Sequence, residues 1–571
     1  MVVEHLDDLP LIGHQIKRLR LADLFNEYFP DHGHWQGISG GKLLQGWLLY
    51  ILSESDHRLS HVEDWASLRL NTLAVLLEEP KLRSLDFCDD RLGRLLDRLS
   101  IDDDWSVFEI SLGKDILQVY QLQSVEGSLE VIRTDSFNAP QFRETGDLFR
   151  HGYSKQRRSD QPFCKVMMSS LDPLALPLAV DIVKGSGPDV DLYLPIISRI
   201  QKTLKKPGHV YVGDSQLGSL PNRLAIHLAG DYYLSPLNKK QVKQEELHRY
   251  LDRIEVPYQE LPSLFTAPGS TRKPAYFFEL QQHIEHQQAQ CSWTERRILV
   301  YSPDYANGLI TSFTNRLSEA EEKIEALVVS KKGRRNPKTL KDLHARIAGI
   351  IKKYKVEDCF DIEASQSIEH IKVRRHKNRP EEIRQKVKLS LVLKRKEAII
   401  SLKKKRLGWQ LYGTNIPEEK MATSRLVKIY RDEYKIEHLF DYFINRDVGL
   451  LPIYLKKEKR VKALIRLLSL AMKFSMLLQN EARKALKEKN EELTGIYPGN
   501  KGRKTTRPTT TMLLAVFRGI STAYMELGGT KMIEMTSLNQ TQEKILTLLK
   551  AQDSYIHTLK LLKTYPSLRE T

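Results

Sequence analysis

The stretch LEVIRTDSFNAP, residues 129–140, decides the fold expected for this chain. Its apolar, β-branched beginning predicts a buried strand that delivers one carboxylate, Asp135, to its end. A second stretch, HVYVGDSQLGS, repeats the pattern about eighty residues later, with Asp214 where the strand gives way to a glycine-containing turn. Two adjacent strands would bring both acids to one edge of a sheet.

A third acid, Glu437, lies in YRDEYKIEHLFDYF, residues 430–443. The spacing predicts one helix with Tyr430, Glu433, Glu437 and Ile444 on a single face. Carboxylates are the hard oxygen ligands that Mg²⁺ prefers, and a two-metal site suits the cutting of phosphodiesters. We therefore expect Asp135 to bridge two metals, with Asp214 and Glu437 holding one each. The alternative, that these acids have no role in chemistry, stays open. The chain has 72 acidic residues, and most acidic side chains of a protein are solvated or salt-bridged.

Length and composition indicate a soluble protein of several domains. The chain has 571 residues, 41% of them apolar, which is too long for one core. No apolar run approaches the roughly 20 residues of a membrane span, and the N-terminus MVVEHLDDLP lacks a signal-peptide core. These features predict a cytoplasmic protein without a membrane partner. The four cysteines form no CxxC pair, which argues against a disulfide framework and a zinc site.

The positive charge is concentrated in one segment. Of a net charge of +17, residues 331–410 hold most, with 25 Lys and Arg against 9 Asp and Glu. Such a run between two candidate catalytic acids favours a polyanion partner, although a solvated charged face is the alternative.

Changes in periodicity divide the chain into five parts. Residues 1–128 predict a separate helical domain that either binds DNA ends or pairs subunits. Residues 129–238 alternate strands and helices and predict an RNase H-like sheet of three antiparallel strands continued by two parallel ones. Residues 239–415 predict a basic inserted domain of mixed α/β type, with KVRRHKNRPEEIRQK (372–386) as a linker. Residues 416–490 resume the core with the Glu437 helix, and 491–571 predict a linker and a helical C-terminus. The expected fold class is therefore α/β, a mixed sheet flanked by helices and interrupted by an insertion.

Several stretches together resemble one family. They are IRTDSF around Asp135, HGYSKQRRSD (151–160), VYVGDSQLGS around Asp214, GWQLYGTN (408–415) and YRDEYKIEHLF followed by RVKALIRLLSLAM. The chain is similar in them to bacterial insertion-sequence DDE transposases, in the superfamily with a β-containing domain inserted between the second Asp and the Glu. The likeness spans about residues 129–475 and implies an RNase H-like catalytic core that uses Mg²⁺, or Mn²⁺ as a substitute.

The resemblance also implies the activity and the partners. Such an enzyme binds the terminal inverted repeats of its own element as double-stranded DNA, cleaves them as an endonuclease and joins the 3′-OH ends to target DNA. It acts near the bacterial nucleoid, and a homodimer is expected in the active complex. Two rival functions remain: a catalytically weakened or inactive DNA-binding derivative, and a Mg²⁺-dependent nuclease without strand joining.

Two positions depart from the superfamily's helical signature. Tyr430 and Glu437 match, but Glu433 stands in place of an Arg and Ile444 in place of a Lys. Arg431, Lys435 or Arg446 could supply the missing phosphate contact. Because Glu433 and Glu437 are helical neighbours, one of them should have a raised pKa unless a cation lies between them or a nearby cation draws Glu433 aside.

Further residues are candidates for DNA contact. The polar loop after the first strand carries Tyr153, Lys155, Arg157 and Arg158, for which phosphate contact is weighed against simple solvation. Trp409 could stack on a flipped base, as an aromatic of the inserted domain does in related transposases, or it could belong to the core.

Overall fold

The computed structural model describes residues 2–122, 129–140, 146–152, 160–187, 189–264, 274–329, 336–373, 382–445, 448–527 and 530–564. The chain divides into two compact units, one formed by Met1–Ser235 with Ile429–Thr571 and the other by Pro236–Lys428. The second unit interrupts the first in sequence, and its bounds differ from those of the expected insertion at 239–415 by 3 residues at the first end and 13 at the second.

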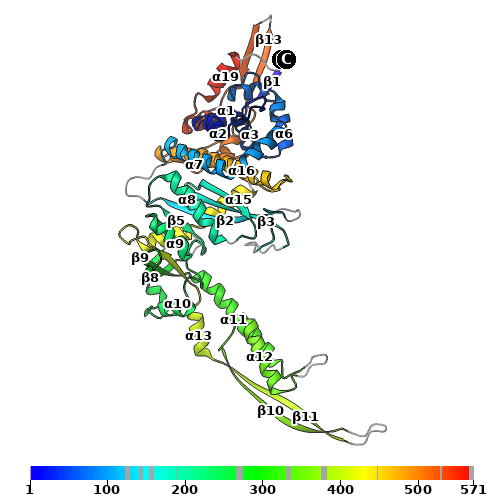
Figure 1. The fold of residues 1–571 in the computed structure, drawn as a ribbon, viewed down its shortest axis with the longest axis vertical. Helices are drawn as coiled ribbons and strands as arrows, with labels where there is room; N and C mark the ends of the chain where they lie inside the picture. Colours follow the sequence, from blue (N-terminus) through cyan, green and yellow to red (C-terminus); the bar gives the residue numbers. More distant parts are fainter. Residues whose placement is uncertain are drawn as a thin grey trace. The chain divides into compact units, whose positions relative to one another are not determined.

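The sheet of the first unit confirms the expected mixed α/β fold (Figure 1). Its strands are β2 (Val131–Pro140), β3 (Phe163–Asp172), β4 (Leu176–Lys184), β5 (Val210–Gly213) and β6 (Tyr232–Pro236), in the order β4-β3-β2-β5-β6. The β4/β3 and β3/β2 pairs are antiparallel, whereas β2/β5 and β5/β6 are parallel. The parallel steps contain the crossover helices α8 (Tyr193–Leu204) and α9 (Leu220–Leu228), as parallel connections require.

The helices of the N-terminal region share their core with this sheet rather than forming a separate domain. They are α1 (Leu9–Arg18), α2 (Leu21–Tyr28), α3 (Gly40–Glu54), α4 (Val62–Ser67), α5 (Leu70–Leu76), α6 (Asp89–Leu99) and α7 (Asp102–Val119). One hydrophobic cluster runs from Leu6 through the strands to Tyr555. This differs from the expected independent domain at 1–128.

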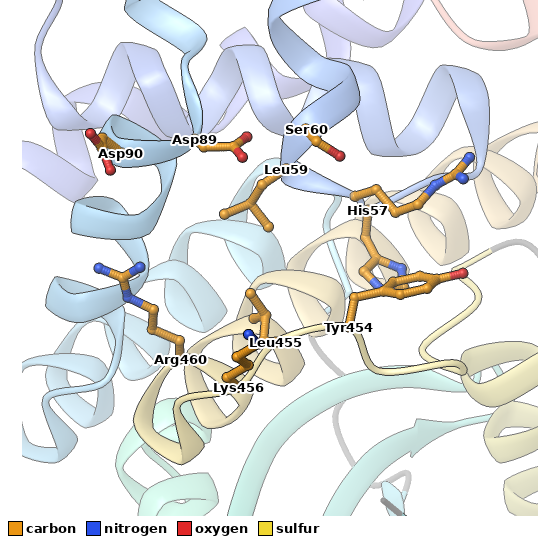
Figure 2. A pocket seen from close by; sticks show the side chains of 10 residues that line it. His57, Leu59, Ser60, Asp89, Asp90, Tyr454, Leu455, Lys456 and Arg460 are labelled. Carbon is orange, nitrogen blue, oxygen red and sulfur yellow. The ribbon is translucent and has the colours of Figure 1, made fainter. Parts of the chain in front are cut away.

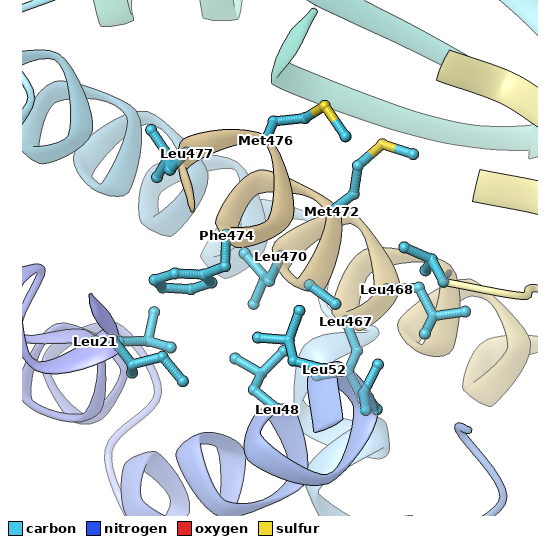
Figure 3. Close-up of a cluster of buried hydrophobic side chains, with 14 of the residues drawn as sticks. Leu21, Leu48, Leu52, Leu467, Leu468, Leu470, Met472, Phe474, Met476 and Leu477 are labelled. Carbon is cyan, nitrogen blue, oxygen red and sulfur yellow. The ribbon is translucent and has the colours of Figure 1, made fainter. Parts of the chain in front are cut away.

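The N-terminal helices and the sheet share one core because of α16 (Glu458–Glu488). The middle of this long helix is buried on nearly all sides. Figure 3 shows Leu470 directed toward Leu48 and Phe474 directed toward Leu21, while Met472 is directed to the opposite side of the helix. The opposite side packs on β4, which α16 contacts extensively. A helix that is apolar all round needs cover on every face, so it joins the N-terminal helices to the sheet.

The C-terminal segment contains strands that the periodicity did not reveal. After α17 (Thr510–Ala515) come β13 (Ser521–Leu527) and β14 (Thr530–Met535), then α18 (Gln540–Leu548) and α19 (Ser554–Thr564). Strand β1 (Val2–His5) pairs with β13 in antiparallel register. A four-residue strand whose partner lies at the other end of the chain carries too short a pattern to be read locally.

The second unit contains a run of four antiparallel strands, a separate strand pair and several helices. Strands β7 (Ser263–Leu264), β8 (Ala275–His286), β9 (Cys291–Tyr301) and β12 (Trp409–Thr414) are antiparallel neighbours in the order β12-β9-β8-β7. Its helices are α10 (Gln244–Leu251), α11 (Pro303–Glu325), α12 (Leu340–Tyr354) and α13 (Glu397–Lys405), and α14 (Thr423–Arg431) follows at its end. A separate pair, β10 (Phe360–Val373) and β11 (Glu382–Arg395), takes up part of the segment that was expected to be a linker at 372–386.

Candidate active site

Strand pairing brings Asp135 and Asp214 next to each other. Strands β2 and β5 run parallel, and their last registered pair is Thr134 with Gly213. Asp135 and Asp214 are the next residues on each strand, and adjacent strands lie only about 4.8 Å apart. The two acids thus meet where β5 ends, as the sequence predicted.

Asp135 itself is not at a strand end, which corrects the expectation. Strand β2 continues to Pro140, because β3 pairs with it along its whole length, with Asp135 opposite Met168. Only the pairing of β2 with β5 ends at this level. Asp135 is therefore held by regular strand structure on one side while its other side borders the β5 turn.

Asp214 is held by two donors. The Tyr193 hydroxyl donates to Asp214 Oδ1 at 2.7 Å, and the backbone N–H of Gln216 donates to the same oxygen at 2.9 Å. Tyr193 is buried at the start of α8, and its burial followed by the charges of Asp214 and Asp135 raises its pKa well above the ordinary value. The phenol therefore stays protonated and remains a donor to Asp214.

Tyr193 was not predicted from the sequence, although Gly213, directly before Asp214, is a signal of close packing at this position. A Cβ atom added at Gly213 would lie 2.9 Å from the Thr134 carbonyl oxygen and 3.1 Å from Cε1 of Tyr193. The glycine directly before Asp214 is thus required for close approach of the tyrosine ring and the strand end.

The predicted helix through Tyr430, Glu433 and Glu437 is broken, and the expectation of one continuous face is wrong. Helix α14 ends at Arg431 and α15 (Tyr434–Asn445) begins three residues later. The N–H of Glu433 donates to the Tyr430 carbonyl at 3.0 Å, a tighter turn than the α-helical spacing of four. The Ile429 carbonyl, the regular partner of that N–H, instead accepts from Arg133 Nη2 at 2.8 Å.

Glu433 lies in the field of the other acids. Burial raises its pKa to about 7, with further raising by Asp135, Glu437 and Asp214 against a lowering hydrogen bond from Tyr430. Glu437 is one turn into α15 and exposed. Four carboxylates from two strands and one helix start therefore share one neighbourhood, and the expected rise in pKa within the Glu433 and Glu437 pair is confirmed for Glu433.

An ion network around the buried Arg133 connects this helix start to the sheet. Asp172, at the end of β3, accepts from Arg133 Nη2 at 2.9 Å and from Lys435 Nζ at 3.1 Å. Lys435 also pairs with Asp432 at 3.2 Å. Arg133 is 3% exposed and stands two residues before Asp135, so one network ties β2, β3 and α15 together. Lys435, which we expected to contact DNA, is engaged in this network.

The clustered carboxylates are donors of the type that a hard divalent cation takes. Oxygen ligands from carboxylates are what Mg²⁺ takes, and mutual repulsion of the kind that raises the pKa of Glu433 is relieved by a cation. Within the described ranges, however, no three His, Cys, Asp or Glu side chains are grouped so that they could hold a metal ion together. Asp135 and Asp214, with Glu433 or Glu437, are the residues that could do so after side-chain adjustment.

Of the other residues expected to contact DNA, some lie outside the described residues and some are half-buried. Tyr153, Lys155, Arg157, Arg158 and Arg446 lie outside the described residues. Arg431 is half-buried at the end of α14.

Trp409 begins β12, and its ring lies 5.0 Å from that of Tyr301. Its Nε1 donates to the Lys405 carbonyl at 3.2 Å, and the side chain packs at the border of a small core. Trp409 is only half-buried, so both alternatives for it stay open.

A cavity of about 390 Å³ lies elsewhere in the first unit (Figure 2). It is lined by His57, Arg58, Leu59, Ser60, Asp89, Asp90, Tyr454, Leu455, Lys456 and Arg460. None of the clustered carboxylates lines it, and two of its cations are already paired, Arg58 with Asp56 and Arg460 with Asp97. The carboxylate cluster, not this cavity, is therefore the candidate for chemistry.

One region of the chain matches a known protein family. Residues 1–112 match a family described as a domain of unknown function, DUF4277. No curated protein matches the chain. Among solved structures, a piggyBac transposase in a synaptic complex with hairpin DNA is similar over 99% of this chain and 84% of its own, at 8% identity and a TM-score of 0.34. No helix in the described part of the chain is both long and apolar enough to cross a membrane.

Proposed function

We propose that the chain is a DNA transposase of the DDE type, which cleaves the ends of its own element and joins the 3′-OH ends to target DNA. The observation that supports this most is the parallel register that sets Asp135 beside Asp214 at the end of β5. The proposed partners are double-stranded DNA and a second copy of the chain.

The proposed catalytic roles are supported by the placement of the acids. Asp135 and Asp214 would hold Mg²⁺, with Glu437 as the third ligand and Glu433 as an auxiliary one. Bound Mg²⁺ would lower the barrier by neutralising charge on the attacking and leaving oxygens of the phosphodiester.

The other residues position these acids. Tyr193 orients Asp214 through its 2.7 Å hydrogen bond. Arg133 and Asp172 hold the turn before α15, and with it Glu433 and Glu437, against the sheet. Preorganised ligands need less rearrangement during the reaction, which is why such a supporting shell matters.

The test is cleavage of end DNA with Mg²⁺ by three proteins: wild type, Asp135→Ala and Asp214→Ala. Loss of cleavage and strand joining with nearly unchanged end binding is expected, because metal ligands act on chemistry more than on distributed phosphate contacts. Asp553→Ala, at an exposed acid before α19, is the matched control. Retained strand transfer in either site variant would refute the proposal.

A second candidate function is a DNA-binding protein descended from such an enzyme without cleavage. Two observations favour it: Glu433 occupies the signature's Arg position, and no three carboxylates of the described residues are grouped for a metal. Wild-type protein that binds end DNA but does not cut it at any Mg²⁺ or Mn²⁺ concentration would favour this candidate.

A further inference from the structure

Glu109 of α7 is a buried carboxylate that binds two cations and a strand. Its side chain is 2% exposed. Oε1 accepts from Lys473 Nζ of α16 at 2.9 Å, and Oε2 lies 3.5 Å from Arg199 Nη1 of α8. Both carboxylate oxygens also accept from the backbone N–H of Val180 in β4, at 3.2 and 3.3 Å. Glu109 therefore connects four elements of the first unit.

Arg199 completes this contact from the side of α8. Its Nη2 lies 3.2 Å from Asp181 Oδ2 and donates to the Val180 carbonyl at 3.2 Å. Strand β4 is the edge of the sheet. Glu109 accepts from the N–H of Val180 and Arg199 donates to its carbonyl, as a further strand would do. The two side chains thus cover part of this edge.

Helices α7 and α8 lie side by side and pack closely at a second place (Figure 1). A Cβ atom added at Gly113 of α7 would lie 2.6 Å from Thr203 Cγ2 of α8. Gly113 follows Glu109 by four residues. Thr203 follows Arg199 by the same spacing, which puts both contacts on one face of each helix. Helix α8 is therefore held against α7 at two places.

The start of α8 reaches the carboxylate site. Tyr193, the first residue of α8, donates to Asp214 Oδ1 at 2.7 Å. Arg199 lies six residues further, about 9 Å along the helix axis. A short helix is a rigid element. A shift of α8 at Arg199 therefore changes the distance between the Tyr193 hydroxyl and Asp214.

We propose that the N-terminal region supports the carboxylate site through Glu109. By binding Arg199, Glu109 fixes α8, and α8 holds Tyr193 against Asp214. Glu109 is thus a positioning residue within residues 1–112, the range that matches the family of unknown function. The inference rests on the proposed function only for the metal that Asp214 would hold, because the connection from Glu109 to Asp214 consists of contacts within the fold.

A buried ion pair also has a purely structural explanation. Glu109 and Arg199 would then only cover the edge of β4 and stabilise the fold, and a buried pair by itself is weak evidence for any further role. The two explanations differ in what loss of the pair does. A structural role lowers the stability of the whole unit, whereas a positioning role loosens the turn at Asp214 while the protein stays folded.

The test compares two matched arginine variants of the full chain. Arg199→Gln breaks the pair with Glu109. The control is Arg91→Gln in α6: Arg91 is 13% exposed against 11% for Arg199, pairs with the buried Asp86 and donates to the Ile38 carbonyl at 3.0 Å. Each variant loses one arginine that is paired with a buried carboxylate, but only Arg199 belongs to α8.

The first measurement needs no metal and is hydrogen exchange of the Gln216 amide, which donates to Asp214 Oδ1 at 2.9 Å. In Arg199→Gln this amide should exchange about tenfold faster than in wild type, the ratio that corresponds to the loss of about one hydrogen bond. In Arg91→Gln it should keep the wild-type rate when urea is used to equalise the free energies of unfolding. Glu109→Gln should act as Arg199→Gln does, and it provides the comparison if the arginine variant does not fold.

The second measurement is binding of Mn²⁺ alone, without DNA. Arg199→Gln and Tyr193→Phe should each weaken binding about 10-fold, as changes in the residues behind metal ligands do. The double variant should bind no more weakly than Tyr193→Phe, because both changes act through one hydroxyl. Arg91→Gln should bind Mn²⁺ as wild type does.

An unchanged exchange rate of the Gln216 amide in Arg199→Gln, or the same acceleration in Arg91→Gln, would overturn the inference. Additive losses of Mn²⁺ affinity in the double variant would overturn it as well, since Glu109 would then not act through Tyr193. Failure of the proposed function is distinguishable. In that case wild type would bind no Mn²⁺ and cut no DNA, while hydrogen exchange would still decide the role of Glu109.

Discussion

Asp135 on β2 and Glu433 directly before α15 are electrostatic neighbours, and Asp135 is the strongest charge among the causes that raise the pKa of Glu433. Just over half the length of the chain separates them in sequence. Their proximity follows from the Arg133 and Asp172 network that fixes the start of α15 to the sheet.

The raised pKa of Glu433 predicts a pH-dependent stability. Its pKa is about 7 in the fold against 4.5 ordinarily, so its favourable contribution is complete below about pH 4.5 and is lost as the pH rises through about 7. Glu433→Gln should therefore match wild type at pH 4.5 and exceed its free energy of unfolding at pH 8 by about 1–2 kcal/mol, discounted for solvent screening. Urea denaturation at both pH values measures this.

The same substitution at Glu543, an exposed residue of α18, is the control and should change stability by less than about 0.5 kcal/mol at either pH. A Glu433→Gln variant with the same stability difference at pH 4.5 and pH 8 would contradict the assignment of the raised pKa.

Removing Asp172 should destabilise the first unit strongly. Asp172→Asn leaves the guanidinium of Arg133, which is 3% exposed, without its carboxylate partner, and breaking a buried pair costs about 3–5 kcal/mol. The control is Asp147→Asn, whose pair with Arg150 is exposed and contributes at most about 1 kcal/mol. Chemical denaturation gives both values, and equal effects would mean that the network does not hold α15 in place.

Close packing at Gly213 predicts opposite effects of alanine at two glycines. Gly213→Ala would place Cβ 2.9 Å from the Thr134 carbonyl oxygen, so we expect a loss of about 1–3 kcal/mol. Gly308→Ala, in α11 with open space around it, should instead gain up to about 1 kcal/mol from helix propensity. Thermal unfolding distinguishes the two; a stabilising Gly213→Ala would show that Tyr193 and the end of β5 are not tightly packed.

Substitutions of Glu433 and of Glu437 should have different effects in cleavage assays. As proposed third ligand, Glu437 should be essential, so Glu437→Gln is expected to lower the cleavage rate at least about 100-fold. Glu433→Arg restores the signature residue, and as loss of an auxiliary ligand it should raise the Mg²⁺ concentration needed for half-maximal rate. Higher activity at unchanged Mg²⁺ dependence would instead show that Glu433 weakens the native enzyme.

The sequence by itself determined the sheet and its two aspartates. Local patterns predicted β2 to β6 in the observed order, because apolar strands bounded by turns and amphipathic crossovers are encoded within a few residues of each other. The place of Asp214 after β5 followed from the same pattern.

Only the tertiary structure decided what depends on distant partners. The Ile429 carbonyl accepts from Arg133 and from the Asp432 N–H where the helix that periodicity extended through Glu433 is broken. The buried Tyr193 donates a hydrogen bond to Asp214, and β1 pairs with β13 from the other end of the chain. In each case the deciding interaction joins residues whose separation leaves no periodic signal, because a hydrogen bond or a buried contact depends on proximity in space and not on spacing along the chain.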